Sequence, residues 1–427
     1  MTDQELHLLL EDMSLQEKID QLLQLTADFY GKTDRDVVTG PASELGISME
    51  DIDLAGSVLN GTGAKALMQI QDAYMDRHPH HIPLLFMMDV IHGYRTIFPA
   101  PIAQGASFDP EMSQKAASIA AREASAAGIH VVFSPMVDLV RDPRWGRVME
   151  STGEDPYLNS RFAAAQIHGF QGDDMKEDGK VCGCIKHFAG YGGAEAGREY
   201  NTVQVSEHTF REYYLPSYEA GIKAGAGMVM TSFNTVNDIP ATINQKLMRQ
   251  MLREEMGFDG VLISDYAAIL ETVAHGASSD KKDAAHKALL AGVDIDMMTG
   301  CYAGELAKLV KEGTIPESLI DESVLRILQL KNQLGLFEHP HKDADPEKEA
   351  RYILCPKHRA LAREAAAASC VLLKNDGVLP IRPSQKVAFI GPYIDNYEIC
   401  SSWAVTGHPE DSVTIRQAAE ELLPDSD

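Results

Sequence analysis

Seven short apolar runs, separated by longer segments with helical periodicity, are the feature that most constrains how this 427-residue chain folds. Such alternation is typical of βα units around a parallel sheet. The expected strands cover residues 56–59, 84–88, 129–134, 181–185, 227–231, 260–264 and 293–297. They fit a doubly wound open sheet or a (β/α)8 barrel. Because no glycine-rich dinucleotide fingerprint follows the first strand, and residues 1–335 suit a barrel of roughly 250 residues plus insertions, we predict an α/β fold of the (β/α)8 TIM-like barrel type.

Capping residues mark the ends of several expected helices. Asp109 stands at an N-cap position with Pro110 at the first helical position, and Gly128 follows the last turn of the same helix. Ser14 and Glu17 form a capping box at the start of an earlier helix. An apolar stripe at helical spacing follows this box, and we expect its members to share one helix: Leu15, Ile19, Leu22 and Leu23.

The character of the chain changes after residue 335. Residues 336–385 open with a polar, proline-bearing stretch and continue with a helix from about Lys357, as expected for a linker with a helix. Residues 386–427 contain an expected strand at 387–390 and an expected helix near 414–423. Since one strand and two helices cannot bury both faces of a sheet, we expect residues 386–427 to be the start of a second, truncated α/β sandwich domain.

Charge and cysteine content exclude several classes of protein. With 63 Asp and Glu against 38 Lys and Arg, the net charge is −25, which repels phosphate backbones and anionic membrane surfaces. We therefore expect neither a nucleic-acid nor a membrane partner. The N-terminal residues lack the basic and apolar regions of a signal peptide, which predicts a cytoplasmic location. Six cysteines are too few for a disulfide scaffold. The sequence does not indicate the oligomeric state, and a homo-oligomer is possible.

Polar residues follow the expected strands at the positions where a βα barrel builds its pocket. They are Asp89, Asp138, Arg147, Lys186, His187 and Asp265. No His pair lies at metal-ligand spacing, and there is neither a Gly-x-Ser-x-Gly elbow nor a Walker loop, so we expect no metal and no cofactor. Carboxylates among hydrogen-bond donors suit glycoside cleavage, in which one carboxylate attacks an electrophilic carbon. The same residues also fit a lyase or an aldolase with Lys186 as a Schiff-base lysine.

The strings around these residues distinguish the two interpretations. They are SLQEKI (14–19), DVIHG (89–93), DPRWGR (142–147), GEDPY (153–157), KHF (186–188), GFDGVLISD (257–265) and LLKN (372–375). In this order they closely resemble glycoside hydrolase family 3 of the β-glucosidase type, and the similarity runs from the first helix to the last residue. The resemblance implies a barrel followed by an α/β sandwich domain.

The resemblance also implies a retaining, exo-acting β-glucosidase that hydrolyses terminal non-reducing β-D-glucosyl residues of β-glucosides or oligosaccharides. Asp265 matches the family's nucleophile, which forms a covalent glycosyl intermediate that water resolves. Asp89 matches the carboxylate that receives outer hydroxyls of the sugar. The other matched residues contact or wall the same sugar: Arg147, Lys186, His187, Met230 and Tyr266. Two cations beside Asp265 and Asp89 are expected to keep both carboxylates ionised at neutral pH.

The sequence departs from the family pattern in three places. Tyr266 stands where the family often has Trp, and Phe233 stands where several members have a Tyr that hydrogen-bonds the nucleophile. The family's β-glucosidases draw their acid/base Glu from the second domain, so that residue is expected on a C-terminal part that this sequence does not contain. Glu199 is the best carboxylate within the chain for the acid/base role.

Three alternatives to a β-glucosidase stay open. A branch of the family that cleaves β-N-acetylglucosaminides carries an Asp-Ser-His or Asp-Thr-His element on the loop after Lys-His, whereas residues 188–200 here include no histidine. A β-xylosidase of the same family is the second alternative, although Asp89 suits glucose and the family's xylosidase-like members tend to carry Glu at this position. The third is a naturally short, non-catalytic sugar-binding protein.

Overall fold

The computed structural model describes residues 1–31, 45–382 and 385–423 of the chain. Its centre is an eight-stranded sheet in the order β10-β7-β5-β4-β3-β2-β1-β11, in which all neighbouring strands run parallel. A parallel bridge between Ile263 and Ile295 joins the two ends of the sheet and closes it. The predicted (β/α)8 TIM-like barrel is confirmed.

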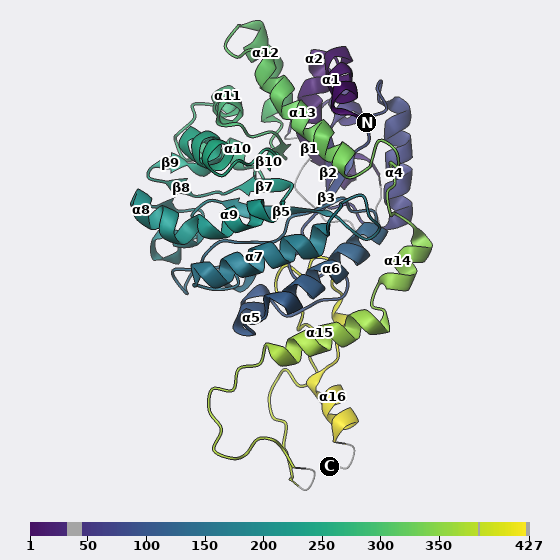
Figure 1. Cartoon of the computed structure of the whole chain (residues 1–427), viewed down its shortest axis with the longest axis vertical. Coiled ribbons are helices and arrows are strands. Elements are labelled where there is room, and N and C mark those ends of the chain that lie inside the picture. The colour runs from purple at the N-terminus through teal and green to yellow at the C-terminus, as the bar shows by residue number, and fades with distance from the viewer. Residues whose placement is uncertain (32–44, 383–384, 424–427) are drawn as a thin grey trace.

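The barrel strands are short and buried, and helices alternate with them along the chain (Figure 1). The strands are β1 Leu23–Thr26, β2 Ser57–Leu59, β3 Leu85–Met88, β4 Val131–Val132, β5 Cys182–Phe188, β7 Met228–Thr231, β10 Val261–Ile263 and β11 Asp296–Met297. Strands that are covered on both faces are mostly apolar, so most of them leave a nearly continuous apolar run in the sequence. For this reason a predicted run overlaps every barrel strand except β1.

Strand β1 corrects the prediction for the N-terminal region. The capping box at Ser14 is confirmed, and α2 (Leu15–Gln21) follows it. The helix ends at Gln21, however, and Leu23 opens β1 instead of continuing the helical stripe. Strand β1 pairs with β11 on one side and with β2 on the other. Pairing on both sides satisfies the backbone groups that a longer helix would have satisfied internally, so tertiary structure outweighs the local pattern here.

Helices surround the barrel (Figure 1). Besides α2, the described α-helices before residue 335 are α1 Asp3–Asp12, α3 Met49–Leu54, α4 Ala64–Arg77, α5 Pro101–Ala106, α6 Pro110–Ala126, α7 Pro156–Gln171, α8 Glu207–Thr209, α9 Pro216–Lys223, α10 Ala268–Ala274, α11 Lys281–Ala291, α12 Cys301–Lys311 and α13 Ser318–Gln333. As predicted, Asp109 caps α6 and Pro110 is its first residue. Gly128 follows this helix with a φ of +95°, which glycine adopts without strain. None of the described helices is long and apolar enough to cross a bilayer.

The apolar core lies inside the barrel and between the strands and the helices. Leu25, Ile185 and Val229 have no exposed surface in the main cluster. A second cluster joins strand residues such as Phe86 and Val132 to the inner faces of α4 and α6. Burial of apolar surface on this scale is the main favourable contribution to folding, and it makes the barrel a rigid support for the loops at its rim.

A small three-stranded sheet lies among those loops. It consists of β6 Thr202–Val203, β8 Thr235–Val236 and β9 Ile239–Pro240, in the order β6-β8-β9. Pairing of β6 with β8 ties the loop after β5 to the loop after β7. Because both loops follow the carboxyl ends of barrel strands, this sheet shapes one side of the barrel mouth.

After residue 335 the chain forms the helices α14 Pro346–Tyr352, α15 Pro356–Ala368 and α16 Ile415–Leu422. The helices predicted from about Lys357 and near 414–423 are confirmed as α15 and α16. The strand predicted at 387–390 is wrong, because these residues have no strand structure and no described strand pairs with them. Residues 383–384 of the predicted linker and 424–427 of the predicted second domain lie outside the described residues.

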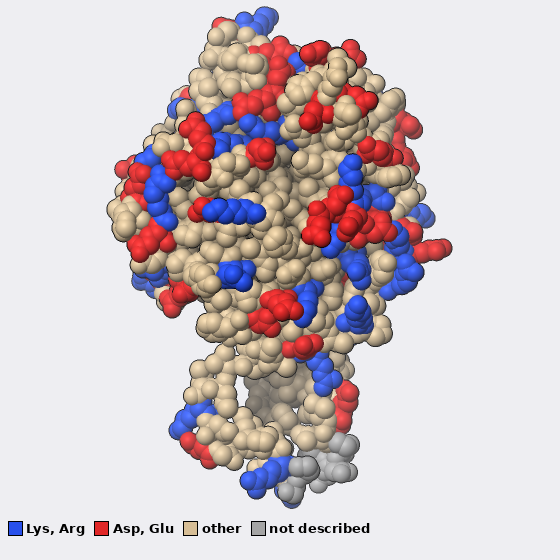
Figure 2. Space-filling model, in the orientation of Figure 1, with Lys and Arg blue, Asp and Glu red and all other residues tan. Residues whose placement is uncertain are grey.

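The described residues 370–382 and 385–423, called the C-terminal extension below, are packed less tightly than the barrel. Figure 2 shows this part of the molecule hollowed at its centre. A cavity of about 1070 Å³ lies between α15, the loop at 95–103 and the extension. Leu373 and Ile390 expose 92% and 91% of their surface. The extension therefore contributes little apolar burial of its own, and its order depends on contacts with the barrel.

Candidate active site

The loops at the carboxyl ends of the strands bring the predicted polar residues together. Asp89 directly follows β3, Lys186 and His187 lie near the end of β5, and Asp265 is the second residue after β10. Lys186 Nζ lies 2.6 Å from Asp89 Oδ1, and His187 Nε2 lies 3.5 Å from Asp265 Oδ2. Residues that are far apart in the sequence thus form one polar cluster at the barrel mouth.

The two carboxylate oxygens of Asp265 lie in different environments. Its Oδ1 accepts the backbone N–H of Tyr266 at 2.7 Å. Its Oδ2 is buried and accepts no hydrogen bond from the described residues. Burial raises the pKa of Asp265 to about 7, although the cations Arg147 and Lys186 lower it. The expectation that these cations keep Asp265 fully ionised at neutral pH is therefore wrong, because desolvation outweighs them.

Asp89 and Lys186 form an ion pair across the mouth. Lys186 exposes 3% of its side chain and Asp89 exposes 18%. A buried ammonium without a partner would cost several kcal/mol, so Asp89 compensates the charge of Lys186. Because Asp89 is partly exposed, it can also accept hydrogen bonds from the hydroxyls of a bound ligand.

Arg147 is held in place by Glu150 and by two aromatic rings. Its Nε and Nη2 donate to the two oxygens of the buried Glu150, at 2.6 and 2.8 Å. Its guanidinium carbon lies 5.3 Å from the ring centre of Trp403 and 5.6 Å from that of Tyr191. Burial opposes the charge, but Glu150 outweighs burial and raises the pKa of Arg147. Arg147 is therefore a fixed positive charge near Asp265, and it lowers the pKa of this carboxyl group.

His187 is buried between Asp138 and Asp265. Asp138 Oδ2 lies 2.8 Å from His187 Nδ1 and accepts the backbone N–H of His187 at 2.9 Å. Tyr218 Oη lies 2.7 Å from Asp138 Oδ1 and 2.6 Å from the His187 carbonyl oxygen. Burial and two nearby cations lower the pKa of His187 well below its usual range, whereas burial raises that of Asp138 to about 7. The imidazole is therefore neutral at neutral pH.

Glu199 reaches the same rim through Tyr191. The Tyr191 hydroxyl donates to Glu199 Oε1, and Glu199 Oε2 is buried with no hydrogen-bond partner among the described residues. The ring of Tyr191 packs edge-on against His187, with the ring centres 5.3 Å apart. A residue that contacts the polar cluster thus holds Glu199 in place.

The two residues expected to wall a sugar differ in position. Met230 lies in β7 beside Ile263 and exposes only 2% of its surface, so it belongs to the barrel core. Tyr266 exposes 36% of its surface and directly follows Asp265. Tyr266 therefore offers an accessible ring at the mouth, whereas Met230 supports the strand ends from within.

The C-terminal extension adds a residue that the sequence analysis missed. The ring centre of Trp403 lies 5.3 Å from the Arg147 guanidinium carbon and 5.3 Å from Lys186 Nζ. An indole face over two cations is electrostatically favourable. Trp403 is one of two tryptophans in the chain, and this scarcity is the signal that could have directed attention to it.

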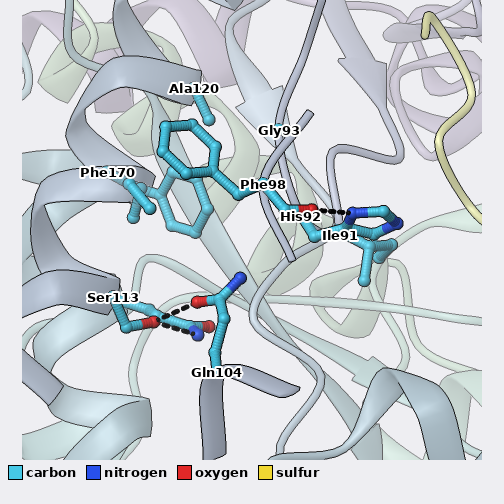
Figure 3. Close-up of a pocket in the computed structure, with 11 residues that line it drawn as sticks. Ile91, His92, Gly93, Phe98, Gln104, Ser113, Ala120 and Phe170 are labelled. Carbon is cyan, nitrogen blue, oxygen red and sulfur yellow. Dashed lines mark hydrogen bonds between the residues drawn. The ribbon is translucent and has the colours of Figure 1, made fainter. Parts of the chain in front are cut away.

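The loop after Asp89 holds the extension over the mouth. His92 Nδ1 lies 2.8 Å from the Phe98 carbonyl oxygen (Figure 3), and His92 Nε2 lies 3.0 Å from the Ser402 carbonyl oxygen. Two more contacts run from this loop to the extension: Thr406 Oγ1 to the Tyr94 carbonyl at 2.5 Å, and Arg95 Nε to Asp411 at 2.5 Å. The same loop therefore positions both Asp89 and Trp403.

A cavity behind this loop is too small to hold a sugar. Ser113 donates to Gln104 Oε1 at 2.7 Å and accepts from Gln166 Nε2 at 2.7 Å (Figure 3). The cavity lined by these residues, His92 and Phe170 measures about 10 Å³, roughly the room of one water molecule. This cavity is therefore not the candidate active site, which is the polar cluster at the strand ends.

The cluster is suited to binding hydroxyl groups. Its carboxylates and imidazole accept hydrogen bonds, and its lysine and arginine donate them. A buried carboxylate oxygen without a partner, beside two cations, fits a nucleophile. In the described part of the chain, no group of three or more His, Cys, Asp or Glu side chains is arranged to hold a metal ion. The roles of the individual residues stay predictions on this geometry.

This chain is similar to known proteins in both sequence and structure. Residues 14–330 match the glycosyl hydrolase family 3 N-terminal domain. The chain is 36% identical over 429 residues to a periplasmic β-glucosidase of Salmonella typhimurium, and 37% identical over 317 residues to a β-xylosidase of Formosa agariphila. These matches cover 98% and 70% of this chain, and 54% and 43% of those proteins. The chain thus spans about half the length of the curated relatives it matches.

A solved structure is similar over the whole chain. The β-glucosidase from Listeria innocua in complex with glucose superposes with a TM-score of 0.97 and is 46% identical. The match covers 100% of this chain and 60% of that one. The similarity therefore includes both the barrel and the C-terminal extension.

Proposed function

Since this chain belongs to glycosyl hydrolase family 3, we propose that it carries the catalytic barrel of a retaining, exo-acting β-glucosidase. The observation that carries the proposal is the buried Oδ2 of Asp265, which has no hydrogen-bond partner among the described residues. The names of the Salmonella and Listeria relatives, which are β-glucosidases, support a β-glucoside as the substrate.

In the proposed reaction, Asp265 Oδ2 attacks the anomeric carbon while the bond from this carbon to the leaving-group oxygen breaks. The bonding electrons leave with that oxygen, which takes a proton from an acid. A water molecule then attacks the anomeric carbon, the bond to Asp265 breaks, and the water proton returns to the same acid/base group. Two displacements on opposite faces retain the β configuration.

The surrounding charges suit this chemistry. Asp265 must be deprotonated to attack, and Arg147 and Lys186 counteract the effect of burial on its pKa. The same cations stabilise the carboxylate that is released when the intermediate breaks down. Their proposed second task, shared with Asp89 and His187, is to bind the hydroxyls of the glucosyl unit.

Rings close the proposed sugar site from outside. Tyr266 is accessible next to Asp265, and Trp403 covers Arg147 and Lys186. The C–H faces of a glucosyl ring pack favourably against such aromatic surfaces. Substrate would therefore enter between the barrel rim and the C-terminal extension, with its leaving group directed outward.

Two sources of the proton are proposed. Within the chain, Glu199 is the candidate, because Tyr191 holds one of its oxygens and leaves the other without a partner among the described residues. The alternative is a Glu in the part of the relatives' length that this chain does not span. A substrate whose leaving group departs without a proton does not need either acid. Such a substrate therefore tests the attack by Asp265 separately from proton donation.

A β-xylosidase is the second candidate, since one relative of that name is 37% identical to this chain. Asp89 favours the glucosidase, because the family's xylosidase-like members tend to carry Glu at this position. The two activities differ only in the hydroxymethyl group of the terminal sugar, so the same site could bind both substrates with different affinity.

Activated aryl glycosides test the proposal. We expect the chain to release 2,4-dinitrophenolate from the β-glucoside faster than from the β-xyloside, and to leave the β-N-acetylglucosaminide intact. Calorimetry should detect binding of glucose. Binding of glucose without release from any of the three glycosides would support a sugar-binding protein, and absence of both would refute the proposal.

A further inference from the structure

We propose that Asp138 is a positioning residue, which fixes the tautomer of His187 so that Nε2 accepts a hydrogen bond from a substrate hydroxyl. This inference rests on the proposed sugar site. Asp138 itself is buried, with 1% of its surface exposed, and its two carboxylate oxygens are occupied by protein groups. It therefore acts on the substrate through His187.

The first step concerns Asp138 Oδ2. This oxygen accepts the backbone N–H of His187 at 2.9 Å and lies 2.8 Å from His187 Nδ1. A carboxylate oxygen without a proton has two lone pairs, so Oδ2 can accept from the backbone N–H and from Nδ1 at the same time. On this geometry we assign the proton of the contact between Oδ2 and the ring to Nδ1.

The second step concerns Tyr218, which keeps Asp138 from turning. Its hydroxyl has one proton and two close oxygen neighbours, Asp138 Oδ1 at 2.7 Å and the His187 carbonyl at 2.6 Å. Whichever of them accepts that proton, Oδ2 remains the partner of Nδ1. The tautomer of His187 is thus fixed for either protonation state of Oδ1.

The third step concerns the other ring nitrogen. With the proton on Nδ1, a neutral imidazole has a lone pair on Nε2. This lone pair lies 3.5 Å from Asp265 Oδ2, which is likewise an acceptor without a donor among the described residues. Two buried acceptors that face each other create a place for a hydroxyl donor, which a sugar supplies.

Two variants of Asp138 of similar size test this role. In Asp138→Asn, the amide oxygen can replace Oδ2 and the amide N–H₂ can donate to the Tyr218 oxygen, whereas Asp138→Leu offers no acceptor. We expect Asp138→Leu to weaken glucose binding about tenfold, because one substrate hydrogen bond loses its fixed acceptor, while Asp138→Asn should stay within about threefold of the parent. An equal loss in both variants would overturn the proposal.

A double-mutant cycle separates positioning from general damage. If Asp138 acts through His187, then Asp138→Leu should cause no further loss of glucose affinity in a His187→Ala background. Additive losses would contradict the proposal. Thermal unfolding of each variant shows whether it is folded under the conditions of the binding measurement.

Nitrogen NMR of the unmodified chain provides a readout that does not depend on any variant of Asp138. In protein with ¹⁵N-labelled histidine, the signals absent from His187→Ala identify His187. We expect a protonated Nδ1 and an unprotonated Nε2, with the Nε2 signal shifting when glucose is added. A protonated Nε2 would overturn the proposal. Failure of the whole chain to bind glucose would instead refute the proposed function while leaving the tautomer measurable.

Discussion

The barrel mouth and the C-terminal extension are built in opposite ways. At the mouth, Lys186, His187 and Asp138 are almost completely buried and each has a close polar partner. In the extension, Leu373 and Ile390 are almost completely exposed, and the ion pair between Asp395 and Arg416 lies in solvent. The two regions nevertheless meet at Trp403, which contacts the cations of the mouth.

This difference shows where the chemistry of the site is determined. Buried charges interact strongly because little water screens them, so small changes at the mouth have large effects. Exposed groups of the extension are screened and interact weakly. We therefore expect substitutions at the mouth to change binding and turnover, and substitutions in the extension to do so only through Trp403.

Replacement of Asp265 gives the largest expected contrast. Asp265→Ala should lower the turnover of 2,4-dinitrophenyl β-glucoside about 10⁴-fold or more, because the covalent intermediate cannot form, while glucose affinity changes little. Kinetics and calorimetry on the same preparation measure both quantities. The matched variant Asp395→Ala, in the extension, should leave both unchanged. A loss of affinity as large as the loss of turnover would make Asp265 a binding or structural residue.

Disruption of each region's ion pair compares the two environments directly. Asp89→Ala leaves the buried Lys186 without its partner and should raise KM about 100-fold, with a lower unfolding temperature. Asp395→Ala likewise removes the ion-pair partner of Arg416. Because this pair is exposed, its loss should change KM and the unfolding temperature very little. Similar effects of the two substitutions on KM and stability would contradict the claim that burial makes the pair at the mouth more important than the exposed pair. Asp89→Glu should shift preference toward the xyloside.

The pH dependence of kcat/KM sharpens the electrostatic account. Asp265 must be ionised, and its pKa is raised to about 7 by burial, so kcat/KM should rise about tenfold per pH unit below pH 7 and then level off. Lys186→Met should move the midpoint to higher pH, because the lysine lowers this pKa. The control Lys374→Met, in the extension, should not move it. A midpoint near 4, the ordinary value for Asp, would contradict the dominance of burial.

Substitution of Trp403 should have the smallest of these effects. Trp403→Ala removes the ring over Arg147 and Lys186 and should weaken glucose binding about threefold to tenfold. Tyr393→Ala removes another exposed aromatic side chain of the extension and should leave the affinity unchanged. Calorimetric titration distinguishes the two. Equal behaviour of both variants would show that the extension does not take part in the site.

Most of the barrel could be predicted because its strands are buried on both faces and leave apolar runs in the sequence. The exception, β1, shows the limit of that signal. Leu22 and Leu23 continue a helical stripe in the sequence, but pairing with β2 and β11 extends the chain from Leu23. The opposite error occurred at residues 387–390, where an apolar run has no described neighbour to pair with. In both cases long-range partners decided the structure, and local patterns do not show them.

The site was predictable to a similar degree. The carboxyl ends of the strands and the resemblance to the family directed attention to Asp89, Lys186, His187 and Asp265, and the structure gathers these four. The ionisation of Asp265 could not be predicted, because the extent of burial depends on the whole fold. Trp403 lies far along the chain, and contacts such as that between His92 and Ser402 bring it to the mouth.

Covalent trapping with 2,4-dinitrophenyl 2-deoxy-2-fluoro-β-glucoside tests the central claim most directly. The fluorine slows breakdown of the glycosyl intermediate, and the leaving group departs without an acid, so a source of protons is not required. Mass spectrometry of the intact chain and of its peptides should show one fluoroglucosyl group attached to Asp265. Attachment to another residue, or an unmodified chain under conditions in which glucose binds, would contradict the account.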